Sequence, residues 1–126
     1  GRHIFDHLII AVGVNSNKKR TVSLNTMIEK IEQLVVNWDH VEVKKYEGLT
    51  ADFAQKVGAQ FILRGIRNST DLDYEASIAN VNYQINSNLE SVFLLSKPEL
   101  SLISSSVVRD LIKYKQDISS YLPYEL

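Results

Sequence analysis

The sequence predicts an α/β protein built on a doubly wound parallel sheet, and three observations support this prediction. Strand patterns alternate with amphipathic helix patterns four times, the order typical of parallel strands joined by helical crossovers. Residues 8–14 (LIIAVGV) form a continuous apolar run, as expected for a strand buried on both faces. The length of 126 residues suits a single core, so we expect one domain over residues 1–126.

A polar, basic loop over residues 15–22 follows the first strand. Ser23 is a suitable N-cap for a helix that we expect to end near Asn37. The apolar residues of this helix recur at helical spacing: Leu24, Met27, Ile28, Ile31, Leu34 and Val35. The alternating pattern of residues 41–46 then predicts a second, more exposed strand.

The middle of the chain contains the next strand and the longest helix. A short helix is expected over residues 49–57, because Gly58 stands where glycine commonly ends a helix. Residues 60–63 form a short strand pattern, and a long helix is expected from about Asp71 to Asn86. One face of that helix is apolar and comprises Tyr74, Ile78, Val81 and Ile85.

The last elements follow the same alternation. Residues 90–95 predict the final strand, and residues 104–106, all serine, open a helix that runs to about Lys113. A final turn is expected over residues 117–122, stopped by Pro123.

Composition excludes several function classes. A net charge of −1 gives no reason to expect binding to nucleic acid or to a membrane surface. No apolar run approaches the roughly 20 residues of a membrane span. The absence of cysteine suits a reducing compartment, and we expect the cytoplasm. The first residue is glycine, so we expect the natural chain to begin further upstream.

Cations and anion-binding groups follow the predicted strands. They are Lys18, Lys19 and Arg20 after the first strand, Gly48 and Thr50 after the second, Arg64 and Arg67 after the third, and the serines at 104–106 after the fourth. In open parallel sheets, ligands bind outside the carboxyl ends of the strands. Paired arginines and a serine-rich helix start are both suited to phosphate. This placement predicts one crevice for a small polyanionic ligand.

Each of these features also has a purely structural interpretation. Residues 18–20 could form a solvated surface turn, and the serines could serve only as a helix cap. Arg64 and Arg67 could form structural salt bridges with nearby acids, namely Asp71, Asp73 or Glu75. Three histidines, at positions 3, 7 and 40, are scattered without metal-ligand spacing, so we expect surface or strand-edge positions and no protein metal site.

Several segments together resemble the bacterial phosphopantetheine adenylyltransferases. The most specific are residues 61–67 (FILRGIR), 71–75 (DLDYE) and 103–109 (ISSSVVR), in this order and at this spacing. Supporting segments are 5–7 (FDH), 16–19 (SNKK), 48–54 (GLTADFA) and 117–123 (DISSYLP). The resemblance covers nearly the whole chain and implies a Rossmann-like nucleotidyltransferase fold.

The resemblance also implies a reaction and a set of binding residues. The reaction is transfer of an adenylyl group from ATP to 4'-phosphopantetheine in coenzyme A synthesis, with Mg²⁺ and with a homohexamer formed by two trimers. The acceptor would be bound by Lys18, Thr50 and Arg64. ATP would be bound by Gly65, Ile66, Arg67, Glu75, Leu100, Ser101, Leu102, Ile103, Ser104, Ser105 and Ser106. Lys18 and Arg67 would support catalysis.

The sequence departs from that family at its start. The family's first central strand and its Thr-x-Gly-His motif lie upstream of Phe5, where this sequence has only four residues. No catalytic residue is therefore assigned, and the 126 residues alone are expected to be catalytically incomplete. Without that strand we expect two half-sheets, unless an upstream segment or a shift of the neighbouring strands fills the gap. Two alternatives are a related nucleotidyltransferase with another phosphorylated acceptor and a non-catalytic nucleotide- or coenzyme A-binding module.

Overall fold

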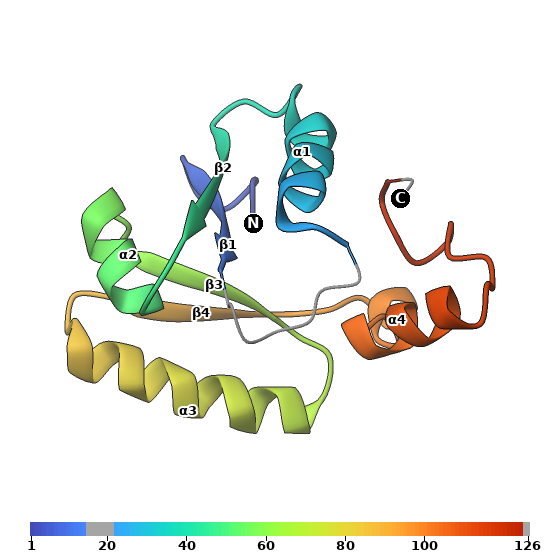
Figure 1. Ribbon diagram of the computed structural model, residues 1–126. Coiled ribbons are helices and arrows are strands. Elements are labelled where there is room, and N and C mark those ends of the chain that lie inside the picture. Colours follow the sequence, from blue (N-terminus) through green and yellow to red (C-terminus); the bar gives the residue numbers. More distant parts are fainter. Residues whose placement is uncertain (15–21, 125–126) are drawn as a thin grey trace. The chain divides into compact units, whose positions relative to one another are not determined.

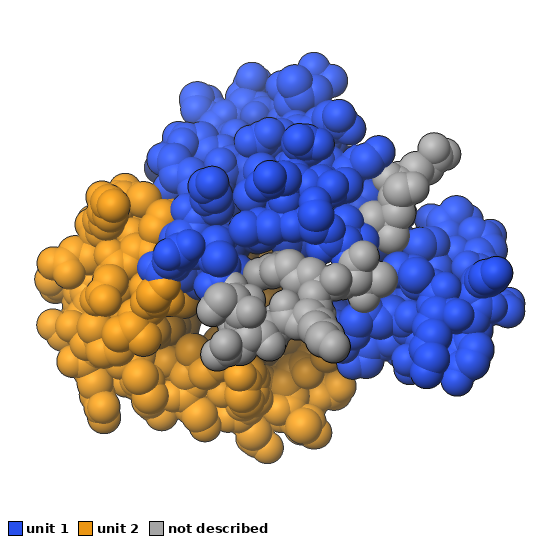
Figure 2. Space-filling model, viewed as in Figure 1, with its two compact units in different colours: residues 1–47, 103–126 blue, residues 48–102 orange. Residues whose placement is uncertain are grey.

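The computed structural model describes residues 1–14 and 22–124. The chain divides into two compact units, which Figure 2 distinguishes by colour. Unit 1 comprises Gly1–Glu47 and Ile103–Leu126, and unit 2 comprises Gly48–Leu102. Each unit contains one pair of parallel strands (Figure 1). The single domain over residues 1–126 stays a prediction.

Unit 1 contains strands β1 (Leu8–Gly13) and β2 (Val41–Tyr46), which pair in parallel from Leu8↔Val41 to Gly13↔Tyr46. Helix α1 (Leu24–Val35) connects them and packs on β2, and helix α4 (Ser105–Lys113) completes the unit. The predicted cap of α1 is confirmed, since the Ser23 hydroxyl accepts a hydrogen bond from the Thr26 backbone N–H at 3.1 Å. The helix ends slightly before the predicted Asn37.

Strand β1 is less buried than the sequence predicts. Only Val12 is buried, while Ala11 and Gly13 are exposed and the first three residues are half-buried. Full burial requires a covering layer on both faces and strand partners on both edges. In the part of the chain that the structure describes, β1 has one hydrogen-bonded neighbour, β2. The apolar sequence of β1 therefore exceeds what unit 1 alone buries.

Unit 2 contains helix α2 (Thr50–Val57), strand β3 (Phe61–Ile66), helix α3 (Ser69–Ile85), strand β4 (Glu90–Leu95) and the short 3-10 helix η1 (Pro98–Leu100). The two strands pair in parallel along their whole length. Their core is a cluster of Ala51, Ala54 and Leu89, against which Ile62 packs. As predicted, Gly58 ends α2, with a φ of 73° that suits glycine.

Two predicted boundaries in unit 2 are wrong. Strand β3 continues to Ile66 instead of ending at Leu63, because its ladder with β4 extends to the pair Ile66↔Leu95. Arg64 and Gly65 therefore lie inside a strand and not in a loop after it. Helix α3 begins at Ser69, before the predicted Asp71, since the Asn68 side chain accepts a hydrogen bond from the Asp71 N–H at 2.9 Å.

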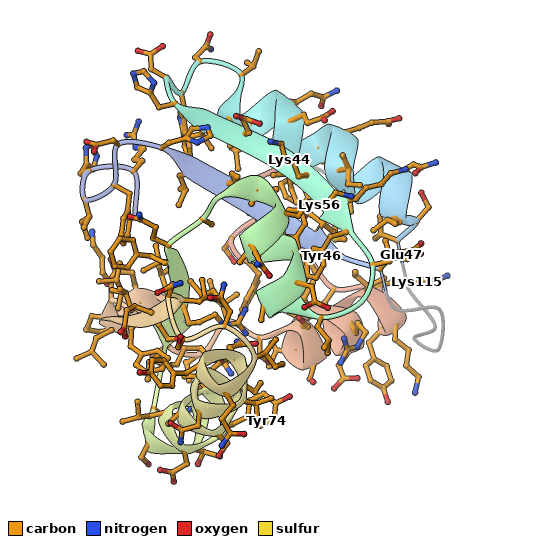
Figure 3. All side chains as sticks on the ribbon, turned by 90° about the vertical axis from the view of Figure 1, so that its left-hand side faces the viewer. Lys44, Tyr46, Glu47, Lys56, Tyr74 and Lys115 are labelled. Atoms are coloured by element: carbon orange, nitrogen blue, oxygen red, sulfur yellow. The ribbon has the colours of Figure 1, made fainter. Side chains whose placement is uncertain are left out.

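Helix α3 leaves most of its predicted apolar face exposed, and only Ile78 of that face is half-buried. Tyr74, Val81 and Ile85 are 66%, 53% and 44% exposed, and Tyr74 lies on the outer side of the helix (Figure 3). The buried residues of α3 are instead Glu75 and Asn82, which stand two turns apart on the face toward β3 and β4. A buried carboxylate is tolerated there because Arg64 of β3 neutralises it.

The α/β class, with parallel strands and alternating helices, is confirmed. The hydrogen-bonded order consists of two separate pairs, β1–β2 and β3–β4, as expected for two half-sheets. The expected shift of neighbouring strands into one ladder does not occur among the described residues. Across residues 1–14 and 22–124, no helix is long and apolar enough to cross a membrane.

Candidate functional site

Arg64 and Glu75 form the most closely packed ion pair of unit 2. Arg64 lies on β3, on the same face of the strand as Ile62 and Ile66. Its Nε donates to Glu75 Oε2 at 2.8 Å and its Nη2 donates to Oε1 at 2.5 Å. The Glu75 side chain is 11% exposed and that of Arg64 is 50% exposed. The carboxylate is thus the inner member of the pair and the guanidinium the outer one.

Arg67 and Asp71 form a second bidentate pair at the connection between β3 and α3. The guanidinium donates from Nε and Nη2 at 2.8 and 2.9 Å, and the Arg67 backbone N–H donates to the same carboxylate at 3.1 Å. Hydrogen bonding from the Arg67 side chain lowers the pKa of Asp71, and the same bond raises the pKa of Arg67. These bonds, together with the Asn68 cap, hold the turn that leads into α3.

The structural interpretation of both arginines, as partners of nearby acids, is therefore confirmed for these two pairs. It does not exclude ligand binding, because half of the Arg64 side-chain surface faces solvent. Lys18 lies outside the described residues. The predicted convergence of Lys18, Arg64 and Arg67 on one anion stays a prediction.

Gly65 and Ile66 differ in their surroundings. The Ile66 side chain is 3% exposed and its carbonyl accepts a hydrogen bond from the Ser96 N–H at 2.8 Å, so this residue serves the core of unit 2. A Cβ at Gly65 would have the Ser96 Oγ, 3.8 Å away, as its nearest neighbour. Packing therefore does not require glycine here, and the role of Gly65 in binding ATP stays a prediction.

Thr50 is the first residue of α2 and is half-buried. Leu49 occupies the N-cap position, and Gly48 before it has a φ of 88°. Since a leucine side chain cannot accept hydrogen bonds, the amides at this helix start depend on other groups. The role of Thr50 in binding the acceptor stays a prediction.

The segment from Leu100 to Ser106 crosses from unit 2 into unit 1. The Ser101 hydroxyl donates to the Pro98 carbonyl at 2.7 Å, and Leu102 is 80% exposed. Ile103 is half-buried. The Ser104 hydroxyl accepts a hydrogen bond from the Val107 N–H at 3.2 Å, which confirms the helix-cap interpretation for this serine.

Ser105 and Ser106 stand exposed in the first turn of α4. The Ser106 hydroxyl accepts a hydrogen bond from Arg109 Nη2 at 3.1 Å. The first turn thus combines two exposed serines with the positive end of the helix dipole, an arrangement suited to phosphate oxygens.

Asn68 was missed as a helix cap in the sequence analysis. Asn68 was detectable, because asparagine three residues before Asp71 matches an N-cap pattern. Tyr46, at the end of β2 (Figure 3), covers Gly13 so closely that a Cβ there would lie 3.3 Å from the phenol oxygen. Tyr46 therefore packs against the backbone of β1.

Within the described ranges, no group of three or more His, Cys, Asp or Glu side chains is arranged to hold a metal ion. The histidines are exposed, and the Nε2 of His7 lies 2.8 Å from Glu42 Oε1. Hydrogen bonding from Lys44, with smaller effects of His7, lowers the pKa of Glu42. The described histidines and Glu42 therefore do not form a site in which protein side chains alone would hold a magnesium ion.

A hollow of about 540 Å³ in unit 1 lies away from the predicted ligand edge. It is lined mainly by residues 2–6 and 39–41, at the amino ends of β1 and β2. Ligands of parallel sheets bind at the opposite, carboxyl ends. We therefore do not assign the predicted polyanion to this hollow.

Parallel strands alternate with helices in this chain, which is the order of a Rossmann-like nucleotidyltransferase fold. The cytidylyltransferase-like family matches residues 1–111. A phosphopantetheine adenylyltransferase of Cytophaga hutchinsonii is 47% identical over 123 residues, covering 98% of this chain and 82% of its own length. Those of Staphylococcus haemolyticus and Bacteroides thetaiotaomicron are 42% and 41% identical, each over 94% of this chain and 74% and 78% of their own lengths. The chain therefore belongs to the cytidylyltransferase-like family and, within it, to the phosphopantetheine adenylyltransferases.

Proposed function

We propose that this protein transfers an adenylyl group from ATP to 4'-phosphopantetheine and releases dephospho-coenzyme A and pyrophosphate. The observation that carries the proposal is the similarity to phosphopantetheine adenylyltransferases across at least 94% of the chain. The arginines of β3 and its exit turn, and the serines at the start of α4, supply the cationic and hydrogen-bonding groups that two phosphate substrates need.

The proposed chemistry is a direct displacement. A phosphate oxygen of the acceptor attacks the α-phosphorus of ATP, a new oxygen–phosphorus bond forms, and the bond to the β-phosphate oxygen breaks. Pyrophosphate leaves with that electron pair. Such a reaction depends on positioning and charge stabilisation and needs no covalent enzyme intermediate.

The proposed binding roles follow the residue types. Lys18 and Arg64 meet the acceptor phosphate, and the backbone near Thr50 holds the pantetheine arm. ATP lies against Gly65, Ile66 and Arg67, with its phosphates at the segment from Leu100 to Ser106. Because three acidic or histidine ligands do not gather among the described residues, we propose that Mg²⁺ arrives bound to the ATP phosphates.

The proposed location is the cytoplasm, and the proposed assembly is a homohexamer of two trimers. Support for an assembly comes from large apolar side chains at the surface, including Leu95, Leu102 and Val36, which are 85%, 80% and 74% exposed.

The test is a pyrophosphate-release assay on the full-length natural protein, with ATP, Mg²⁺ and a panel of phosphorylated acceptors. We expect product only with 4'-phosphopantetheine, identified by mass as dephospho-coenzyme A. Turnover with a different acceptor would instead support a related nucleotidyltransferase. Binding of ATP or coenzyme A without any pyrophosphate release would support a non-catalytic binding module.

A further inference from the structure

We propose that Asp71 is a positioning residue for ATP, which holds the guanidinium of Arg67 in the orientation that the nucleotide phosphates require. The inference rests on the proposed function, in which ATP lies against Arg67, and it adds a supporting residue to that site. It starts from the turn between β3 and α3 (Figure 1). There the Asp71 carboxylate accepts hydrogen bonds from Arg67 Nε at 2.8 Å and from Nη2 at 2.9 Å.

The carboxylate also binds the backbone of the same arginine. Asp71 Oδ2 accepts the Arg67 N–H at 3.1 Å in addition to Nε, so one oxygen atom joins the main chain of Arg67 to its own side chain. An unsupported arginine side chain samples many rotamers, and this freedom must be lost when it binds a ligand. The bonds to Asp71 restrict that freedom before ATP arrives.

Asp71 is itself held in place by the start of α3. Its backbone N–H donates to Asn68 Oδ1 at 2.9 Å, and the end of β3 is held by the bond from the Ser96 N–H to the Ile66 carbonyl at 2.8 Å. Arg67 follows directly at the carboxyl end of β3, the end of a parallel strand at which ligands bind. The turn therefore presents a fixed cation at that end of the strand.

Exposure and charge indicate how each member of the pair can act. The side chains of Arg67 and Asp71 are 30% and 22% exposed, so neither is closed off from solvent. Hydrogen bonding from the Arg67 side chain lowers the pKa of Asp71, so the carboxylate is charged at neutral pH. Because a carboxylate repels phosphate oxygens, Asp71 supports ATP binding through the arginine and not by direct contact.

A purely structural pair and a positioning pair predict different kinetics. If Asp71 only closes the turn, its loss lowers the free energy of unfolding and leaves both KM values of the folded enzyme unchanged. If the carboxylate competes with the ATP phosphates for Arg67, its loss lowers the KM for ATP. If Asp71 orients Arg67, its loss raises the KM for ATP and leaves the KM for the acceptor nearly constant.

The experiment measures both KM values in Asp71→Asn, Arg67→Ala and the double variant of the full-length protein, with folding checked by circular dichroism. Asp71→Asn keeps the size of the side chain but removes the charge and one acceptor oxygen. We expect its KM for ATP to rise about tenfold, as for loss of a charged hydrogen bond, and its KM for 4'-phosphopantetheine to change by less than about twofold. In the Arg67→Ala background, adding Asp71→Asn should not raise the KM for ATP further, because the residue that Asp71 orients is gone.

Asp73→Asn is the matched control, because it removes the same charge from an exposed position two residues further along α3. It should leave both KM values unchanged. An unchanged or lower KM for ATP in folded Asp71→Asn would overturn the inference. A further rise in the double variant would also overturn it, since Asp71 would then act on ATP or its Mg²⁺ directly.

Two further measurements apply if the first experiment gives no kinetics. If Asp71→Asn does not fold, Asp71→Glu replaces it, since it keeps the charge and displaces the carboxylate; its KM for ATP should also rise, and an unchanged value contradicts the inference. If the unmodified protein shows no turnover, the proposed function fails, and calorimetric binding of ATP to the same variants decides the inference. Weaker binding in Asp71→Asn than in Asp73→Asn supports it. Equal or tighter binding, or no binding of ATP to the unmodified protein, overturns it.

Discussion

At the scale of single residues, two neighbouring arginines have partners at different distances along the chain. Arg67 pairs with Asp71 four residues ahead, so this pair closes a local turn. Arg64 pairs with Glu75 eleven residues ahead, so that pair joins a strand to a helix. The Arg67–Asp71 pair should therefore stabilise the turn before α3. The Arg64–Glu75 pair should stabilise the packing of α3 against β3.

The Asp71 pair predicts a specific pH dependence of stability. The pKa of Asp71 is lowered from 3.8 in the folded protein, so the pair stabilises the folded state fully above pH 3.8 and loses this effect as pH falls through the lower, folded value. We expect Asp71→Asn to reduce the free energy of unfolding at pH 7. This difference from the unmodified protein should shrink below pH 3.8. Urea unfolding of both proteins across this range measures it, and a pH-independent difference would contradict the assignment.

Because Arg67 and Lys18 are proposed to bind different substrates, replacing each of them should affect the KM of a different substrate. Arg67→Ala should raise the KM for ATP, and Lys18→Ala should raise the KM for 4'-phosphopantetheine, each by about tenfold for a lost charged contact. Steady-state kinetics with each substrate varied in turn provides the measurement. Small, equal changes for both substrates would argue against separate subsites.

At the scale of elements, local hydrogen bonds shape the connections that follow the strands. Asn68 starts α3 directly after β3, and Ser104 starts α4 after η1. The same serine was expected both to cap the helix and to face phosphate. Its hydroxyl accepts the Val107 N–H, so the capping role is the one that affects stability without ligand.

Replacement of Ser104 by alanine should lower the free energy of unfolding by about 1 kcal/mol, the usual cost of losing an N-cap. The matched control is Ser105→Ala, because Ser105 is exposed in the first turn and does not occupy the cap position. Its effect should stay within about 0.5 kcal/mol. Chemical unfolding of both variants without nucleotide tests the assignment, which equal losses would refute.

At the scale of the whole molecule, the described chain buries little of its apolar sequence. Leu89 is the largest fully buried side chain, whereas the apolar face of α3 and the residues Leu95 and Leu102 are exposed. Apolar surface of this extent favours association with further protein. The two separate strand pairs also leave part of the apolar sequence of β1 uncovered.

We therefore expect the full-length protein to form a hexamer in solution, with a mass about six times that of its own chain. Sedimentation equilibrium measures this mass independently of molecular shape. Because a closed symmetric hexamer leaves no interface free for further subunits, the measured mass should not change with protein concentration over the working range. A monomeric mass would refute the proposed assembly.

Most of the elements were predictable because their signals are local. The strands over residues 41–46 and 90–95, the caps Ser23 and Ser104 and the helix-ending Gly58 appear as expected. Hydrogen bonds in caps and turns join residues three or four positions apart, so the sequence encodes them directly.

The candidate site was predictable in its residue types but not in its pairing. The sequence named Asp71, Asp73 and Glu75 as possible partners of two arginines and could not choose among them. The choice depends on where β3 ends and on which face α3 turns toward it. Extension of β3 to Ile66 and burial of Glu75 bring Arg64 and Glu75 together.

The sequence by itself determined the α/β order of elements, their caps and the family to which the chain belongs, since these depend on local patterns and on the spacing of motifs along the chain. Tertiary structure alone decided that α3 buries Glu75 and Asn82 while most of its predicted apolar face is exposed, that β1 is only partly buried, and that Glu75 pairs with Arg64. The physical reason is that burial and long-range ion pairs depend on which surfaces meet. Residues eleven positions apart meet only when a strand and a helix pack together.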